Sequence, residues 1–243
     1  MMSSSKLLIF ILIAFLSTTV NGQDAILELT SKKEFKEQSD NHINSAILSK
    51  DGYHVITGYT RVNENGGKDI WVAKLNVTGE LLWQKTFGGI NNDEGTAIIE
   101  TNSGDYAIVG HSINSNSGYT EGWFLKLNTD GKQIAKSVYS ISPYLKINDI
   151  KNFEKNNFII CGVREESGDD DKNFMIMKIN AKGTKLWQQE VGTKYFTDEA
   201  FCLSITKSNE IIAGGYTTDD KKQQSALLVK VDAYGKILFE EKN

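Results

Sequence analysis

Two acidic dipeptides recur in the sequence, Asp93-Glu94 and Asp198-Glu199. Paired carboxylates can hydrolyse a glycosidic bond when one acts as the acid and the other as the base or nucleophile. The four residues are therefore candidate catalytic groups of an extracellular, glycosidase-like hydrolase. Their recurrence at equivalent places favours instead a repeated structural task such as capping a strand, because a catalytic centre normally breaks repeat symmetry with one unique set of residues.

The most acidic stretch is the segment Glu165–Asn173, EESGDDDKN. Carboxylates offer the oxygen ligands that Ca²⁺ prefers, so Asp169, Asp170 and Asp171 are candidate ligands of a weak calcium site. The spacing of an EF-hand loop is missing, however, and charged surface loops are common. A solvated acidic loop is the favoured interpretation, and the sequence predicts no other cofactor.

Other signatures of catalysis or cofactor binding are missing. His42, His54 and His111 are too scattered to suggest a metal site, and there is no GxSxG, P-loop, dinucleotide-binding or CxxC motif. A net charge of -4 provides no basic surface for nucleic acid. Cys161 and Cys202 fall at small apolar positions, which predicts buried free thiols, although an oxidising compartment could join them.

Three sets of residues recur with a spacing of 52 residues. They are Lys74, Lys126, Lys178 and Lys230; Gly58, Gly110, Gly162 and Gly214; and Gly79, Gly131, Gly183 and Gly235. A period in this range is typical of solenoids and propellers. The third set closes Asn/Asp-x-x-Gly turns, where Asn or Asp stabilises the turn and Gly supplies the positive φ. The lysines are predicted to lie along apolar surface with a solvated ammonium group.

Four strands are predicted in each repeat. In the second copy they are Ala97–Thr101, Tyr106–Gly110, Trp123–Leu127 and Gln133–Tyr139. The second and third are continuous β-branched and aromatic runs, which predicts burial on both faces, whereas polar residues interrupt the fourth, as an outer edge strand requires. The sequence therefore predicts an all-β fold over residues 44–243, a β-propeller of four blades with four antiparallel strands each.

Propeller topology also predicts which face binds a partner. The long connections join the second strand to the third and the fourth strand to the first, on one face. They are Arg61–Asp69, Ile113–Glu121, Glu165–Asn173 and Thr218–Gln224, with Gly88–Gly95, Ser140–Asn148 and Gly192–Glu199. Tyr119, Tyr144 and Tyr195 in these loops are candidate contacts, alongside the two acidic dipeptides, for a glycan, a peptide or a surface protein. Ordinary loop packing is an equally good interpretation of the tyrosines.

Three phrases carry a resemblance to a known kind of repeat: DGYHVITGYT (Asp51–Thr60), DIWVAKLNVTGELLWQKTFGG (Asp69–Gly89) and SGDYAIVGHS (Ser103–Ser112). They resemble the propeller-type repeats of roughly 50 residues in predicted secreted bacterial proteins. The resemblance covers Asn44 to about Glu241 and implies the fold, but no activity. Its members often have more repeats, so four repeats imply either a small closed propeller or an open one that needs a partner.

The first 22 residues have the features of a cleaved secretory signal. Lys6 precedes the apolar run Leu7–Leu16, which is shorter than the about 20 residues that span a bilayer, and small residues follow. An uncleaved anchor or a buried helix is the alternative. We expect cleavage after Gly22 and a secreted or periplasmic protein without a membrane span. Residues 23–43 are then either an arm or a closing strand.

Two classes of function follow from these features. The favoured one is a non-catalytic binding module that uses the long-loop face. The alternative is an extracellular hydrolase that uses the loop carboxylates, and a purely structural repeat module is a third interpretation. The sequence predicts neither the ligand nor the oligomeric state.

Overall fold

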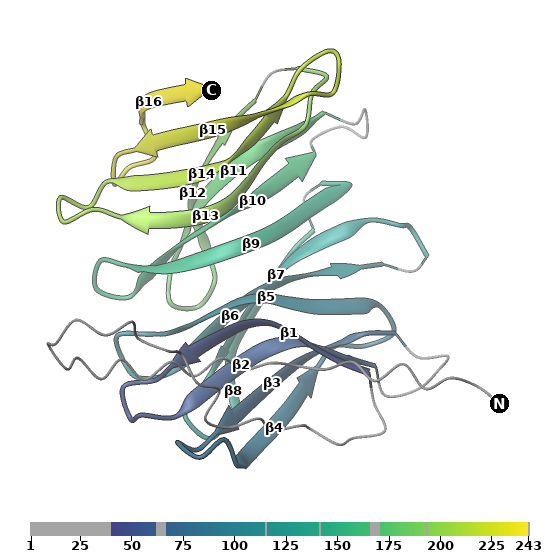
Figure 1. The fold of residues 1–243 in the computed structure, drawn as a ribbon, viewed down its shortest axis with the longest axis vertical. Helices are drawn as coiled ribbons and strands as arrows, with labels where there is room; N and C mark the ends of the chain where they lie inside the picture. The colour runs from purple at the N-terminus through teal and green to yellow at the C-terminus, as the bar shows by residue number, and fades with distance from the viewer. Residues whose placement is uncertain are drawn as a thin grey trace, which may run out of the picture. The chain divides into compact units, whose positions relative to one another are not determined.

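The computed structural model describes residues 40–61, 67–114, 116–140, 142–165, 171–192 and 194–242. The described residues belong to one compact unit, Ser39–Asn243. The predicted signal peptide and the segment from residue 23 to residue 39 lie outside the described residues. Within the described ranges the regular structure is entirely β, with sixteen strands (Figure 1). No helix that could cross a membrane is found in this part of the chain.

The strands form four groups of four in chain order. The first group is β1 (Asp40–Leu48), β2 (His54–Arg61), β3 (Asp69–Leu75) and β4 (Leu81–Phe87). The second is β5 (Asn92–Glu100), β6 (Tyr106–Ile113), β7 (Thr120–Leu127) and β8 (Gln133–Tyr139). The third is β9 (Tyr144–Phe153), β10 (Asn157–Glu165), β11 (Lys172–Ile179) and β12 (Lys185–Val191). The fourth is β13 (Asp198–Ile205), β14 (Ile211–Thr218), β15 (Gln224–Val231) and β16 (Ile237–Lys242).

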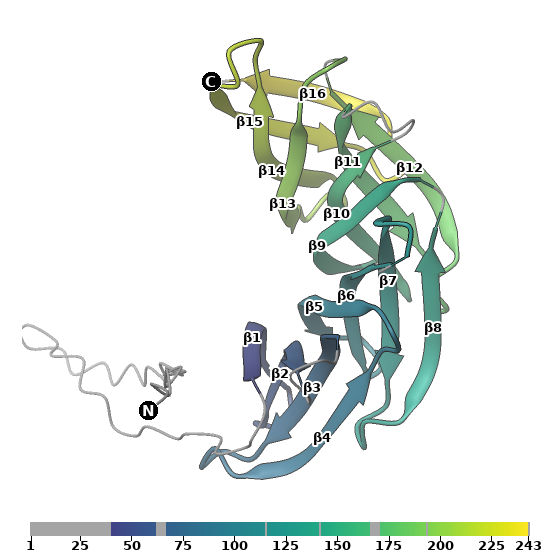
Figure 2. The ribbon, with the colours of Figure 1, turned by 90° about the vertical axis from the view of Figure 1, so that its right-hand side faces the viewer.

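Within each group every strand pairs antiparallel with the next one. The second and third groups join into one eight-stranded sheet, because Thr120 in β7 makes a parallel bridge to Tyr144 in β9. Lys172 makes a similar isolated bridge to Thr197, and the Asp93 amide donates to the Lys68 carbonyl at 2.7 Å. The same short joint thus links each group to the next, and Figure 2 shows the groups in succession.

The all-β prediction is confirmed, but the first strand of each group is longer than predicted. β8 has the predicted bounds, whereas β5 begins at Asn92 instead of Ala97. A β-bulge between Gly95 and Ala97 interrupts the alternation of side chains there, so that the polar start of the strand has no clear strand pattern. The acidic dipeptides Asp93-Glu94 and Asp198-Glu199 therefore lie in β5 and β13, and the prediction that they lie in loops was wrong.

Repeated glycines let the first and second strands of a group approach closely. A Cβ atom at Gly58, Gly110 or Gly162 would lie 1.9, 2.0 or 1.9 Å from a carbonyl oxygen of the adjacent strand. In the fourth group Gly215 has this role, at 1.8 Å from the Glu199 carbonyl, and the prediction of Gly214 was wrong by one residue. The reason is one extra residue before the acidic dipeptide of the fourth group: Asp198 follows the end of β12 at Val191 by seven residues, whereas Asp93 follows the end of β4 at Phe87 by six.

Apolar side chains fill the space between successive groups. Val55, Ile70 and Val72 of the first group pack against Ile108 and Leu125 of the second, and two further clusters lie at the next two junctions. The second and third strands are buried on both faces in the first three groups, as predicted. β4 and β16 are largely exposed, which confirms the edge character of the fourth strand.

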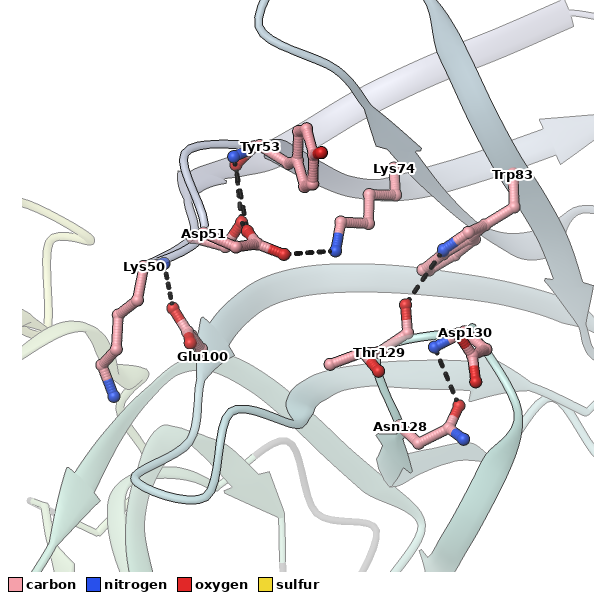
Figure 3. Close-up of polar contacts among 10 residues, drawn as sticks. Lys50, Asp51, Tyr53, Lys74, Trp83, Glu100, Asn128, Thr129 and Asp130 are labelled. Carbon is pink, nitrogen blue, oxygen red and sulfur yellow. Dashed lines mark hydrogen bonds and ion pairs between the residues drawn. The ribbon is translucent and has the colours of Figure 1, made fainter.

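The repeated lysines form ion pairs instead of keeping a solvated ammonium group. Lys74 Nζ lies 2.7 Å from the Asp51 carboxylate, which belongs to the turn between β1 and β2 (Figure 3). The equivalent pairs are Lys126–Asp105 at 2.9 Å, Lys178–Glu154 at 2.9 Å and Lys230–Glu210 at 2.8 Å. Each pair ties the third strand of a group to the turn between its first two strands, so these lysines are structural.

The two cysteines are free, and they differ in exposure. Cys161 is buried as predicted, but Cys202 is exposed, so that prediction was wrong. The one-residue shift of β13 and β14 places Leu203 opposite Ala213, in the position where Ile98 pairs with Ile108. Leu203 thereby takes the buried position that the 52-residue period assigned to Cys202.

Candidate functional site

One position of the repeat varies while its neighbour remains glycine. The residues that follow the close-approach glycines in the second strands are Tyr59, His111, Val163 and Tyr216. Their partners across the first strands are His42, Glu94, Lys146 and Glu199. The backbone is the same in all four groups, and the chemistry differs in each. We call Glu94, His111, Lys146, Glu199 and Tyr216 the variable cluster.

Glu94 is held by two donors from the first group. Asn44 Nδ2 donates to Oε1 at 2.8 Å, and Lys68 Nζ lies 3.2 Å from Oε2. Lys68 Nζ also lies 3.7 Å from the centre of the Tyr59 ring. Burial raises the pKa of Glu94, but the Asn44 amide and the Lys68 ammonium outweigh it, so the pKa is lowered. Glu94 is therefore a carboxylate at neutral pH.

Glu199 is held in a similar way, by two residues of the third group and one of its own group. Asn148 Nδ2 donates to its Oε1 at 2.9 Å, Lys146 Nζ lies 3.6 Å away, and the Tyr216 hydroxyl lies 3.4 Å from Oε2. Asn44 and Asn148 both occupy β-bulges, and each also donates to a backbone carbonyl of the next group, Gly95 or Ala200. The bulge aims both amides across a junction.

The pKa of His111 is set by burial and by the charges of two carboxylates and two lysines. Burial lowers its pKa to about 4, with Glu94 and Glu199 acting to raise it and Lys146 and Lys68 to lower it. Its Nδ1 atom is buried and has no hydrogen-bond partner among the described residues. Histidine is therefore neutral at physiological pH, and around it two carboxylates face two ammonium groups.

The three candidate tyrosines have different surroundings. Tyr144 begins β9 and is half-buried; burial first and the Glu199 carboxylate second raise its pKa, and Lys172 Nζ lies 4.9 Å from its ring centre. Tyr119 is 53% exposed between β6 and β7, and Tyr195 is 69% exposed between β12 and β13. The structure therefore brings only Tyr144 to the variable cluster.

Asp93 and Asp198 are buried, unlike the glutamates beside them. The Gly89 amide donates to Asp93 Oδ2 at 3.1 Å. A Cβ atom at Gly88 would lie 2.1 Å from Asp69 Oδ1 and 2.7 Å from Asp93 Oδ2, so the two carboxyl groups enclose this glycine. Asn173 and Asp198 enclose Gly192 likewise. These buried aspartates hold the connection between two groups.

The proposed calcium ligands are only partly described. Asp169 and Asp170 lie outside the described residues. Asp171 Oδ1 accepts a hydrogen bond of 3.1 Å from the Tyr195 amide. In the described parts of the chain, no three histidine, cysteine or acidic side chains are grouped as metal ligands would be.

Sequence reasoning missed Lys68, His111, Lys146 and Tyr216. The signal that could have found three of them is variation at a fixed distance from a repeated glycine. His111 follows Gly110 and Tyr216 follows Gly215, and Lys146 lies opposite the residue that follows Gly162. Lys68 lies just before β3, outside the first and second strands of its group, so this signal does not apply to it.

Comparisons with known proteins identify no family. No family model matches the sequence, and no curated protein matches it. Among solved structures, a eukaryotic initiation factor has a TM-score of 0.38 at 10% identity, over 82% of this chain and 55% of that one. Pyrococcus horikoshii acylaminoacyl peptidase has a TM-score of 0.46 at 12% identity, over 82% and 32%. The tail fibre of Staphylococcus aureus phage P68 has a TM-score of 0.17 at 7% identity, over 86% and 64%. The chain thus spans between a third and two thirds of those proteins.

Proposed function

We propose that the chain is an exported, non-catalytic binding module of the propeller type, and that its variable cluster binds an uncharged glycan. The observation that carries the proposal is that the pair of side chains at one position of a repeated backbone differs in every group. A structural residue would be repeated with the scaffold, as the close-approach glycines and the ion-paired lysines are. Side chains that vary between repeats at a fixed backbone position are typical of a binding site.

The charges of the variable cluster favour an uncharged polar ligand. Glu94 and Glu199 are balanced by Lys68 and Lys146, and His111 is neutral at physiological pH. Sugar hydroxyl groups can donate to the carboxylates and accept from the ammonium groups in place of water. The half-buried Tyr144 provides an apolar edge beside these groups. An anionic ligand would have to displace one of the two carboxylates from its lysine.

The same geometry is less favourable for a glycosidase. Hydrolysis needs one carboxyl group that is protonated and can act as an acid, so its pKa must be raised. Asp93 has a raised pKa, with burial as the main cause, but it is covered and bonded to Gly89. The accessible Glu94 has a lowered pKa instead. The hydrolase remains the second candidate because the variable cluster contains two carboxylates, Glu94 and Glu199.

The test is thermal unfolding of the protein against a panel of soluble neutral glycans, with Glu199→Gln as the site variant and Glu240→Gln on the exposed edge strand as the control. A ligand at a hundred times its Kd adds about 2.7 kcal/mol, which raises the Tm of a domain of this size by roughly 5–10 °C. We expect a shift for the wild type and the control, and a smaller one for Glu199→Gln. A panel in which no glycan shifts the transition contradicts the proposal and favours a structural role.

A turnover assay separates the two candidates once a glycan is found. A binding module leaves the glycan intact, whereas a hydrolase releases new reducing ends and loses that activity in Glu94→Gln while retaining binding. Release of reducing ends by the wild type would replace the proposed function with the hydrolase.

A further inference from the structure

The fourth group has an uncovered apolar face. In each of the first three groups, one face of the strands is covered by the next group, as the three apolar clusters show. The same face of the fourth group carries Phe201, which is 48% exposed, Leu228, which is 38% exposed, and the exposed Cys202. These side chains have no counterpart of comparable exposure on the covered faces.

The strand register shows why this face is hollowed. Gly214 pairs with Leu228, as Val109 pairs with Phe124 in the second group. Val109 and Phe124 are buried and fill the junction to the third group, whereas glycine and leucine at their positions leave space. A hollow of about 390 Å³ results. It is lined by Phe201, Cys202, Gly214, Ala226, Leu228 and Glu241, among others.

Phe201 projects beside this hollow from the β-bulge of β13. The residues at the equivalent bulges reach across to the next group: Asn44 and Asn148 donate to backbone carbonyls, and the Thr96 hydroxyl donates to the Ile147 carbonyl at 2.6 Å. Phenylalanine cannot make this bond. Its ring lies 5.5 Å from the Tyr216 ring, measured between centres, and stays half exposed. The face is therefore suited to an apolar partner, not to another joint of the same kind.

We propose that two copies of the chain pair through this face, with Phe201 of one copy in the hollow of the other. A two-fold interface requires that projection and hollow lie on one surface, and here they are adjacent. The pairing does not depend on the proposed glycan site.

The first test measures mass in solution by light scattering or sedimentation velocity over a dilution series. Wild type shifts from dimer to monomer on dilution. Phe201→Asp places a charge in the apolar contact and is monomeric throughout. Leu186→Asp, at an equally exposed leucine on β12, is the control and dimerises like the wild type. A wild type that stays monomeric, or a Phe201→Asp variant that still dimerises, overturns the proposal.

Cys202 provides a second test on the unaltered protein. Cys161 is buried, so a maleimide labels Cys202 selectively, and Cys202→Ala measures any background. Pairing through this face covers the thiol, and the labelling rate then falls as the protein concentration rises. A rate that does not change with concentration, in samples that light scattering shows to be dimeric, places the interface elsewhere and overturns the proposal.

Discussion

The junction between the first and second groups and the junction between the second and third groups perform the same task with different residues. At the first, Trp83 Nε1 donates to the Thr129 carbonyl at 3.1 Å, in the turn between β7 and β8 (Figure 3). At the second, Ala135 takes the place of that tryptophan. There the Tyr139 hydroxyl donates to the Gly183 carbonyl at 2.6 Å. Both hydrogen bonds attach the fourth strand of one group to the turn between the third and fourth strands of the next group.

The third junction returns to the first device. Trp187 Nε1 donates to the Ala233 carbonyl at 3.2 Å, and Asn148 crosses the junction as Asn44 does. The middle junction has Thr96 in that position. Alternate junctions are thus alike, so the structure repeats in pairs of groups even though the sequence repeats by single groups. The two carboxylates of the variable cluster, Glu94 and Glu199, both belong to the asparagine type of junction.

The largest effect is expected from removing the tryptophan that joins the first group to the second. Trp83→Ala removes the hydrogen bond to Thr129 and the packing on Tyr106, whose ring centre lies 6.3 Å from that of Trp83. We expect a loss of about 3 kcal/mol in the free energy of unfolding, at the low end for a large aromatic residue because Trp83 is partly exposed. Urea unfolding measures it.

The middle junction provides the matched control. Tyr139→Phe keeps the ring and removes only the hydrogen bond to Gly183, so we expect a loss of about 1–2 kcal/mol. Equal losses in Trp83→Ala and Tyr139→Phe would show that the hydrogen bond alone fastens each junction and that the indole packing adds nothing.

Local features of each group can be predicted from the sequence, whereas features that depend on pairing between strands or groups cannot. The spacing of the lysines and turn glycines predicts the strand order and the edge strands, because turns and buried runs are local properties. The fourth group shows the limit: Gly214 and Gly215 are adjacent, and only the pairing with Glu199 reveals which of them permits the close approach. The variable cluster depends on three groups being packed together, so no local pattern could bring His111, Lys146 and Glu199 together.

The second prediction concerns the pH dependence of stability. It contrasts His111, which lies opposite Glu94, with Tyr216, which lies opposite Glu199. The pKa of His111 is lowered to about 4, mainly by burial, from the value of about 6.5 expected in the unfolded chain. As the pH drops from about 6.5 to about 4, His111 binds a proton in the unfolded chain but not in the folded chain. The free energy of unfolding therefore falls over this range. The shift corresponds to about 3 kcal/mol.

His111→Gln removes this titration and flattens the loss of stability between these pH values. Glu199→Gln, which leaves His111 in place, should retain most of the slope and is the comparison variant. Chemical unfolding at a series of pH values gives both curves. A variant without His111 that loses stability as steeply as the wild type would assign the acid sensitivity to other groups.

The smallest expected effect concerns a charge at the first junction that the third junction lacks. Asp69 shares Gly88 with Asp93, whereas the neutral Asn173 shares Gly192 with Asp198. Burial raises the pKa of Asp93, and the Asp69 charge raises it further; burial also raises that of Asp69. Raised carboxyl pKa values stabilise the fold below about pH 3.9, and this contribution is lost as the pH rises through them.

Asp69→Asn makes the first junction resemble the third. The amide oxygen can still accept from Gly89, and the repulsion with Asp93 is gone, so we expect a gain of about 0.5–1 kcal/mol at neutral pH, or a Tm higher by about 2–3 °C. The gain should vanish well below pH 3.9, where the carboxyl groups are protonated in both folded and unfolded chains. Asn173→Asp should lower the Tm by a similar amount at neutral pH, because it places a charge beside the buried Asp198. A gain from Asp69→Asn that is the same at every pH would mean that shape or hydrogen bonding, not charge, makes the two junctions differ in stability.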